Sequence, residues 1–442
     1  MESKMERLAI AQLLDWKNRT RRKPLLLDGA RQVGKTWLVE RLFGERHFPA
    51  VHRVDFLAEP DIAGIFDDGL EAEQIIANLE ISRGRKISLE TDLVFLDEVG
   101  ECQPAIDSLK YFAERMPRAH ICATGSNIGL LGSFPVGKVE FLELFPMCFE
   151  EFVMASENHL LHQAFQERRR GRTVHRELWS LLLDYYFVGG MPEAVDAWFN
   201  RGRSGSPLER TGAVKKIHRD LIAGYQRDFG KYGGKQHAGH IEAVFRNIPG
   251  QLARVMDDSV KRFMFKGVIE NKSRYQQLRG PTNWLVRAKL ASQCFPIDSR
   301  PTVPLEALAK ENIFKLFLFD VGLLGHMLNM EYADQRAQAA SYKGFIAENF
   351  VQNELRSRLR NPTYSWAESR GEIEFLHRCQ SGEIIPVEVK SGARTRAKSL
   401  RAYIERYAPA HTVKLTGTEG KWPDKGRDLV WPLYYARHLD QL

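Results

Sequence analysis

The sequence predicts an α/β protein whose first part is a parallel β-sheet with helices on both faces. Three observations predict this fold class. One apolar run leads into a glycine-rich loop and then a helical pattern, a second apolar run ends in two acidic residues, and further apolar runs alternate with helical patterns through residues 1–150. Alternating strands and helices with short connections are typical of parallel sheets.

The glycine-rich loop is the most specific of these features. It follows the apolar run Leu25–Leu27 and reads Gly-Ala-Arg-Gln-Val-Gly-Lys-Thr, which matches the pattern GxxxxGK(S/T). In such a loop the backbone N–H groups surround nucleotide phosphates, the lysine reaches the β- and γ-phosphates, and the hydroxyl ligates Mg²⁺. We therefore predict a P-loop that binds ATP and Mg²⁺. The predicted nucleotide-binding residues are Gly29, Ala30, Arg31, Gln32, Val33, Gly34, Lys35, Thr36 and Trp37.

The acidic pair predicts hydrolysis as well as binding. The apolar run Leu93–Leu96 ends in Asp97 and Glu98. Carboxyl ends of parallel strands share one edge of a sheet, where ligands bind in open α/β folds. We predict that Asp97 holds Mg²⁺ through its water shell, and that Glu98 orients and deprotonates the attacking water.

A third strand is predicted to reach the same edge. The segment from His120 to Asn127 ends in small polar residues, and such residues beside the acidic strand can sense the γ-phosphate. Ser126 is the predicted sensor, Thr124 and Asn127 are its rivals, and ordinary turn residues are the alternative. The remaining elements predicted for this sheet are strands at 52–56 and 139–145 and helices at 71–79 and 105–116.

Charge is unevenly distributed along the chain, whose net charge is +8. Residues 1–150 carry a net charge of −5, residues 151–300 a net charge of +10, and residues 301–442 a net charge of +3. A basic region can bind the phosphates of DNA, so we predict DNA contact through residues 151–330; a solvated basic face is the alternative.

Nothing in the composition predicts secretion or a membrane. The first residues lack the pattern of a secretion signal, and the five cysteines are scattered without a CxxC pair, which is typical of reduced thiols in the cytoplasm. The most apolar segment, Phe314–Leu328, is too short to span a bilayer and contains Lys315 and Asp320. We expect a cytoplasmic protein in which that segment is a buried helix.

Several motifs together resemble the bacterial and archaeal AAA-type P-loop ATPases that carry a C-terminal domain of unknown function. These motifs are Gly-Ala-Arg-Gln-Val-Gly-Lys-Thr, Val-Phe-Leu-Asp-Glu-Val, Ala-Thr-Gly-Ser-Asn, residues 141–152, residues 186–194, residues 314–324 and residues 386–392. The resemblance implies an AAA/RecA-like ATPase core at 1–150, a helical lid or linker region at 151–235, a winged-helix-like domain at 236–330 and a small α/β nuclease-like domain at 331–442. Where the family has Gly-Arg, a candidate arginine finger, this sequence has Gly137-Lys138.

The last module resembles the core of PD-(D/E)xK nucleases. Its candidate site residues are Glu348 on a helix, Glu374 on one strand, and Glu388 and Lys390 on the next. Side chains alternate along a strand, so Glu388 and Lys390 share a face. The pattern departs from the family at Glu374, where the motif has the shorter aspartate, and a nuclease-like fold that binds without cutting is the alternative.

Three functions remain open at this point. The lead is an ATPase whose nucleotide state drives C-terminal modules that act on DNA. The rivals are an ATP-regulated nuclease that uses Glu374, Glu388 and Lys390, and a STAND-like signalling switch that binds proteins without nucleic acid. The sequence also leaves open whether the chain forms a homo-oligomer.

Overall fold

The computed structural model describes residues 5–67, 69–126, 128, 134–199, 205–230, 234–254, 262–337, 343–359, 362–368, 371–391, 398–421 and 426–442. The chain divides into two compact units. The N-terminal unit comprises residues 6–145 and 287–289, and the C-terminal unit comprises residues 1–5, 146–286 and 290–442.

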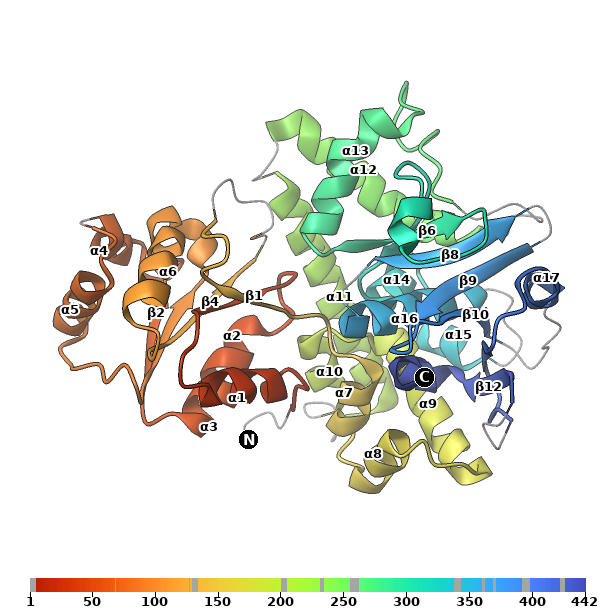
Figure 1. The fold of residues 1–442 in the computed structure, drawn as a ribbon, viewed down its shortest axis with the longest axis horizontal. Helices are drawn as coiled ribbons and strands as arrows, with labels where there is room; N and C mark the ends of the chain where they lie inside the picture. Colours follow the sequence, from red (N-terminus) through yellow and green to blue (C-terminus); the bar gives the residue numbers. More distant parts are fainter. Residues whose placement is uncertain are drawn as a thin grey trace. The chain divides into compact units, whose positions relative to one another are not determined.

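The N-terminal unit is built on a five-stranded sheet in the order β2-β3-β4-β1-β5, with every pair parallel (Figure 1). This confirms the predicted fold class. The strands are β1 Leu25–Asp28, β2 Val51–Asp55, β3 Leu93–Asp97, β4 His120–Gly125 and β5 Glu140–Glu143. The helices are α1 Ile10–Asn18, α2 Lys35–Trp37, η1 Leu38–Gly44, α3 Glu45–His47, η2 Pro60–Ala63, α4 Gly64–Asp67, α5 Ala72–Arg83, η3 Val99–Glu101 and α6 Gln103–Arg115.

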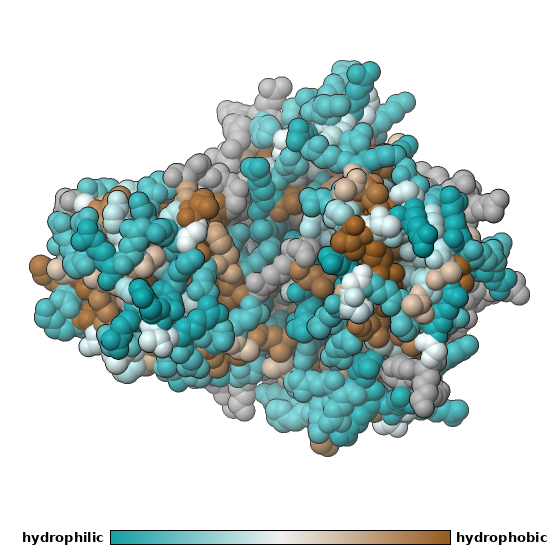
Figure 2. All heavy atoms as spheres, viewed as in Figure 1, coloured by the Kyte–Doolittle hydropathy of each residue, from teal (hydrophilic) through white to brown (hydrophobic). Residues whose placement is uncertain are grey.

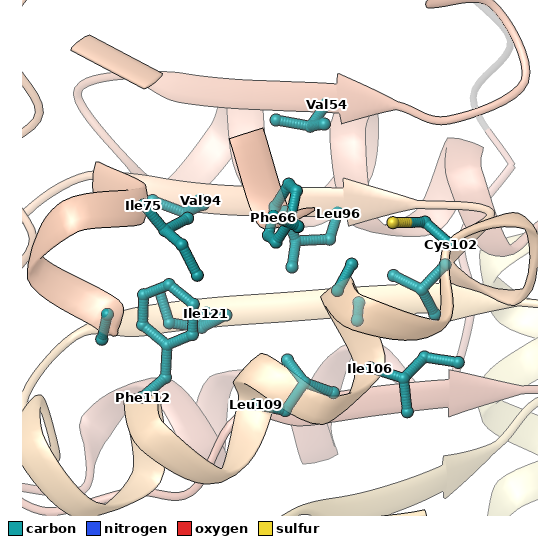
Figure 3. Packing of buried hydrophobic residues seen from close by; sticks show 14 of the residues in the cluster. Val54, Phe66, Ile75, Val94, Leu96, Cys102, Ile106, Leu109, Phe112 and Ile121 are labelled. Carbon is teal, nitrogen blue, oxygen red and sulfur yellow. The ribbon is translucent and has the colours of Figure 1, made fainter. Parts of the chain in front are cut away.

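Alternation along the strands gives this sheet two apolar faces. On one face Val94, Leu96 and Ile121 pack against Phe112 of α6 and Ile75 of α5, and Figure 3 shows these side chains pointing toward one another. Helix α6 can cover this face because its own apolar residues recur at helical spacing and so form one apolar side of the helix. Burying both faces is what a parallel sheet requires.

The C-terminal unit contains a mixed seven-stranded sheet in the order β12-β11-β10-β9-β8-β6-β7. Its strands are β6 Ala291–Ile297, β7 Lys315–Leu318, β8 Thr363–Glu368, β9 Gly371–Arg378, β10 Ile384–Lys390, β11 Thr412–Thr416 and β12 Asp428–Pro432. Strands β6 and β7 lie in the predicted winged-helix region, yet they join the sheet of the predicted nuclease-like module. The sheet therefore crosses the boundary predicted at residue 330, and the four-domain division stays a prediction.

Helices make up most of the remainder of this unit. They are α7 Phe149–Ala155, α8 His159–Gln166, α9 Arg172–Val188, α10 Pro192–Phe199, α11 Pro207–Phe229, α12 Gly234–Ala253, α13 Tyr275–Arg287, η5 Leu305–Leu308, α14 Val321–Met327, α15 Tyr332–Arg336, α16 Lys343–Leu359, α17 Lys398–Tyr407 and η6 Leu433–Gln441.

The apolar segment Phe314–Leu328 corrects one prediction. It is not a single buried helix but strand β7 followed by helix α14. The Asp320 side chain accepts a hydrogen bond from Leu323 N and so begins the helix. A short apolar run cannot be assigned to strand or helix by its periodicity, and the N-cap was the signal that separates the two halves.

Asp320 also joins two distant segments of this unit. Its carboxylate is buried and accepts a hydrogen bond from Gly190 N at 2.6 Å. The carboxylate can come this close because Gly189 has no side chain: a Cβ there would overlap Asp320 Oδ1, and a Cβ at Gly190 would overlap the backbone oxygen of Met147. A Cβ at Gly322 would likewise overlap the backbone of Val188 and Gly189. Three segments that carry the family motifs therefore meet backbone to backbone.

The visible face of the molecule is mostly hydrophilic, with smaller hydrophobic patches between the polar side chains (Figure 2). Within the described ranges, no helix combines the length and the apolar character needed to cross a membrane.

We expect Gly190→Ala to destabilise the C-terminal unit by about 3 kcal/mol, because the added methyl group meets backbone that cannot move aside. Gly224→Ala is the matched control. Gly224 lies in α11 with open space around its Cβ position, so the same change should stabilise the helix by about 1 kcal/mol. Urea unfolding followed by circular dichroism measures both. Equal midpoints for the two variants would contradict the packing at Gly190.

Candidate nucleotide site

The P-loop leaves strand β1 at Asp28 and enters a continuous helical segment that begins at Lys35. Two of its residues have left-handed backbone, Gln32 with φ 65° and Gly34 with φ 89°. Gly29 is required for a different reason, since a Cβ there would overlap the backbone oxygen of Leu144. Glycine at these two positions allows the tight curve that turns backbone N–H groups inward.

A residue outside the motif holds this loop in place. Arg7 is almost fully buried, and its Nη1 donates to Val33 O at 2.7 Å while Nη2 donates to Phe145 O at 2.7 Å. The guanidinium thus ties the P-loop to the chain that follows β5. Sequence reasoning missed Arg7 because nothing local marks an arginine as buried.

Lys35 is buried within the loop, with 5% of its surface exposed. Its Nζ donates to Gly29 O and Ala30 O at 2.9 Å each, and to Ser126 Oγ at 3.0 Å. Burial lowers the pKa of Lys35 to about 8, although the carboxylates of Glu98, Asp28 and Asp97 oppose that shift. The ammonium is therefore held by neutral oxygen atoms in a site where an anionic ligand would be a stronger partner.

Asp97 lies at the end of β3 and is 1% exposed. Its Oδ1 accepts hydrogen bonds from Thr36 Oγ1, at 3.1 Å, and from Thr124 Oγ1. Its Oδ2 accepts from Arg53 Nη2 at 2.7 Å. Strand β4 lies between β1 and β3, which is why Thr124 can contact the acidic strand while Ser126 contacts the P-loop lysine.

The Thr36 hydroxyl and the Asp97 carboxylate fit Mg²⁺. Both are hard oxygen donors, they are in direct contact, and Mg²⁺ is bound in proteins by one or two such groups together with water and substrate phosphates. Among the described residues, no group of three or more His, Cys, Asp or Glu side chains is placed to hold a metal ion.

Glu98 follows directly and has an unusual backbone. Its φ is 55°, a left-handed conformation that costs a non-glycine residue about 1 kcal/mol. Burial raises the pKa of its carboxyl group, and the charge of Lys35 and a hydrogen bond with the Ser126 backbone oppose that rise only in part. Strained backbone of this kind is typical of functional sites.

The structure brings together most of the predicted nucleotide-site residues. Arg31 lies near enough to influence the charges of Lys35 and Glu98. Trp37 follows in α2, where it is half-buried. Asn127 lies outside the described residues. Lys138, at the position of the family arginine, is half-exposed and pairs with Glu114 at 2.7 Å.

The candidate nuclease residues of the C-terminal unit also lie close together. Lys390 Nζ is 2.8 Å from Glu388 Oε1 and 3.5 Å from Glu374 Oε1, and Val389 N donates to Glu374 Oε2 at 3.0 Å. Burial raises the pKa of Glu374 to about 7, although the charge of Lys390 opposes the shift. Glu348 is almost fully buried on α16.

A second lysine, which the sequence did not predict, completes this cluster. Lys315 on β7 is 4% exposed, and its Nζ lies 3.5 Å from Glu348 Oε2 and forms an ion pair with Glu372. Two ammonium groups thus lie among four carboxylates, those of Glu348, Glu372, Glu374 and Glu388.

Comparison with known proteins adds to this geometry. Residues 21–153 match a family model described as AAA domain, residues 180–334 match Domain of unknown function (DUF8612), and residues 343–435 match Domain of unknown function (DUF4143). No curated protein matches the chain.

Three solved structures were compared at the level of the fold. AMPPCP-bound DnaA from Aquifex aeolicus is 11% identical with a TM-score of 0.26, over 54% of this chain and 76% of that one. Drosophila ORC bound to DNA is 13% identical with a TM-score of 0.24, over 73% and 85%. A DNA polymerase III gamma subunit-related protein from Thermotoga maritima is 12% identical with a TM-score of 0.24, over 79% and 99%. Likenesses this weak carry no argument about the present chain.

The AAA-domain match and the parallel five-stranded sheet agree with each other. The chain is thus similar to the P-loop ATPases of the AAA type over residues 21–153, and the rest of it matches domains of unknown function.

Proposed function

We propose that this protein is a Mg²⁺-dependent ATPase whose reaction takes place at the carboxyl edge of strands β1, β4 and β3. The observation that carries the proposal is the set of direct contacts from Lys35 to Ser126 and from Asp97 to Thr36 and Thr124. These contacts join a phosphate-binding loop, an acidic strand end and a polar strand end in one site. ATP hydrolysis needs all three parts.

Each residue of this site has one task in the proposed reaction. The loop N–H groups and Lys35 bind the phosphates, and Lys35 exchanges its bonds to Gly29 O and Ala30 O for the stronger bonds to phosphate oxygen. Thr36 and Asp97 would hold Mg²⁺, which neutralises the charge that develops on the phosphates.

Glu98 is the proposed general base and Ser126 the proposed sensor. The raised pKa of Glu98 makes it a better proton acceptor than an exposed carboxylate, so it can take a proton from the attacking water. Ser126 already bonds to Lys35, so the arrival of a γ-phosphate at Lys35 changes the surroundings of Ser126 directly.

We further propose that the nucleotide state drives action on DNA through residues 151–330. Support comes from the 25 basic against 15 acidic side chains of residues 151–300. The rival nuclease is favoured by the contacts of Lys390 with Glu374 and Glu388. A signalling switch without nucleic acid is the remaining rival.

We expect Lys35→Ala to weaken ATP binding by about 100-fold, since it removes charge-assisted hydrogen bonds to phosphate. Isothermal titration with ATP and Mg²⁺ measures the affinity. The control is Lys23→Ala, which removes an exposed lysine just before strand β1 and should leave the ATP affinity unchanged. Equal affinities for the two variants would rule out the phosphate-binding role of the loop.

Glu98→Gln should bind ATP normally and hydrolyse it at least about 100-fold more slowly, because the amide keeps the shape of the side chain but cannot accept the proton. Single-turnover hydrolysis separates this step from binding. Glu101→Gln, in the exposed part of η3, is the matched control and should keep its rate. Unchanged turnover in Glu98→Gln would assign the base to another residue.

The molecule on which the proposed ATPase acts can be tested by adding DNA to the purified full-length chain. We expect duplex DNA to raise the ATP turnover rate and the effect to fall steeply with salt, as phosphate contacts do. Nicking of supercoiled plasmid that disappears in Glu388→Ala would instead establish the nuclease. If DNA neither stimulates ATP turnover nor is nicked, the signalling switch is the function that remains.

A further inference from the structure

Arg53 is a charged residue of the nucleotide site to which the proposed reaction gives no task. It lies on strand β2, which pairs with β3 so that Asp55 stands beside Asp97. Its Nη2 lies 2.7 Å from Asp97 Oδ2 and 2.7 Å from Asp55 Oδ2, and its Nη1 lies 3.2 Å from Glu40 Oε2. One guanidinium therefore contacts three carboxylates around the acidic strand end.

The two oxygen atoms of Asp97 are held by different kinds of group. Oδ1 accepts from the hydroxyls of Thr36 and Thr124, on α2 and β4, so these neutral groups already fix the plane of the carboxylate. Oδ2 accepts a hydrogen bond from Arg53, and that contact brings a full positive charge. The contribution specific to Arg53 is thus charge rather than orientation.

Arg53 is also placed so that its side chain can move away from Asp97. Its side chain is 33% exposed, whereas that of Asp97 is 2% exposed. When Arg53 releases Asp97 it keeps Asp55 and Glu40 as partners, so no buried charge is left without a counter-charge on the arginine side. A buried lysine or arginine with a single partner could not be displaced so easily.

We propose that Arg53 is a positioning residue that occupies the outer oxygen of Asp97 in place of a cation, and thereby raises the Mg²⁺ concentration that the nucleotide site requires. The inference rests on the proposed ATPase function. A guanidinium and a hydrated divalent cation compete for the same carboxylate, and each lowers the affinity of the other by the same factor. Asp97 would then bind Mg²⁺ when nucleotide is present, and it would keep its ion pair with Arg53 when nucleotide and Mg²⁺ are absent.

The experiment measures cation binding rather than turnover. Mn²⁺ is titrated into the full-length protein saturated with the non-hydrolysable analogue AMPPCP, and free Mn²⁺ is followed by its electron paramagnetic resonance signal. A parallel titration without the analogue subtracts other sites. We expect Arg53→Gln to bind Mn²⁺ about tenfold more tightly than the wild type, because the competing charge is gone. Arg53→Lys, which keeps the charge, should stay close to the wild type.

Arg85→Gln is the matched control. Arg85 donates hydrogen bonds to His52 Nδ1 and Val51 O, at the start of strand β2 and away from Asp97 at the end of β3, so its loss should not change the Mn²⁺ affinity. If Arg53→Gln does not fold, the double variant Arg53→Gln/Asp55→Asn replaces it. The second substitution removes one of the carboxylates that lose their cation, and the same increase in Mn²⁺ affinity is expected.

The outcomes separate the two levels of the proposal. Unchanged Mn²⁺ affinity in Arg53→Gln would reduce Arg53 to a structural ion pair, and weaker affinity would make it an orienting group; either result overturns the inference. A wild-type protein that fails to bind AMPPCP at all would instead overturn the proposed ATPase function. If the wild type binds AMPPCP with Mn²⁺ and Arg53→Gln has the same Mn²⁺ affinity, only the role of Arg53 is overturned.

Discussion

The buried carboxylate of Asp97 is the interaction on which the nucleotide site depends. A carboxylate that is 1% exposed has lost its water, and it is stable only if protein donors replace that water. Thr36, Thr124 and Arg53 do so from three different elements. Meeting this one requirement fixes how α2, β4 and β2 stand around the end of β3, and so fixes the site.

The order of the sheet explains why these donors converge. Because β4 lies between β1 and β3, its carboxyl end faces the P-loop on one side and the acidic pair on the other. Thr124 serves the acidic side and Ser126 the loop side. A different strand order with the same sequence motifs would have kept the motifs and lost the contacts between them.

Local patterns were enough to predict the parallel sheet, the P-loop and the strand ending in Asp97, since each depends on neighbouring residues in the chain. The fold class is confirmed, and the side chains predicted for the nucleotide site lie together. Arg7, Arg53 and Lys315 could not be predicted, because their roles depend on partners 26 to 138 residues away or on another strand. The segment Phe314–Leu328 was assigned wrongly for a different reason: the periodicity of a short apolar run does not separate strand from helix, and the local N-cap signal at Asp320 was overlooked.

The two acidic clusters of this chain are neutralised in ways that suit different tasks. Asp97 is balanced by an arginine that is one-third exposed and has two other partners, so its positive charge can be exchanged for a metal with nucleotide. Glu348 pairs with Lys315, whose side chain is 5% exposed, so this ammonium group is held in the interior beside its carboxylates. The first arrangement favours a site that gains and loses cations, and the second favours one that keeps the charges it has. This contrast agrees with the proposed ATPase site in the N-terminal unit, where the charge around Asp97 has to change when Mg²⁺ and nucleotide bind.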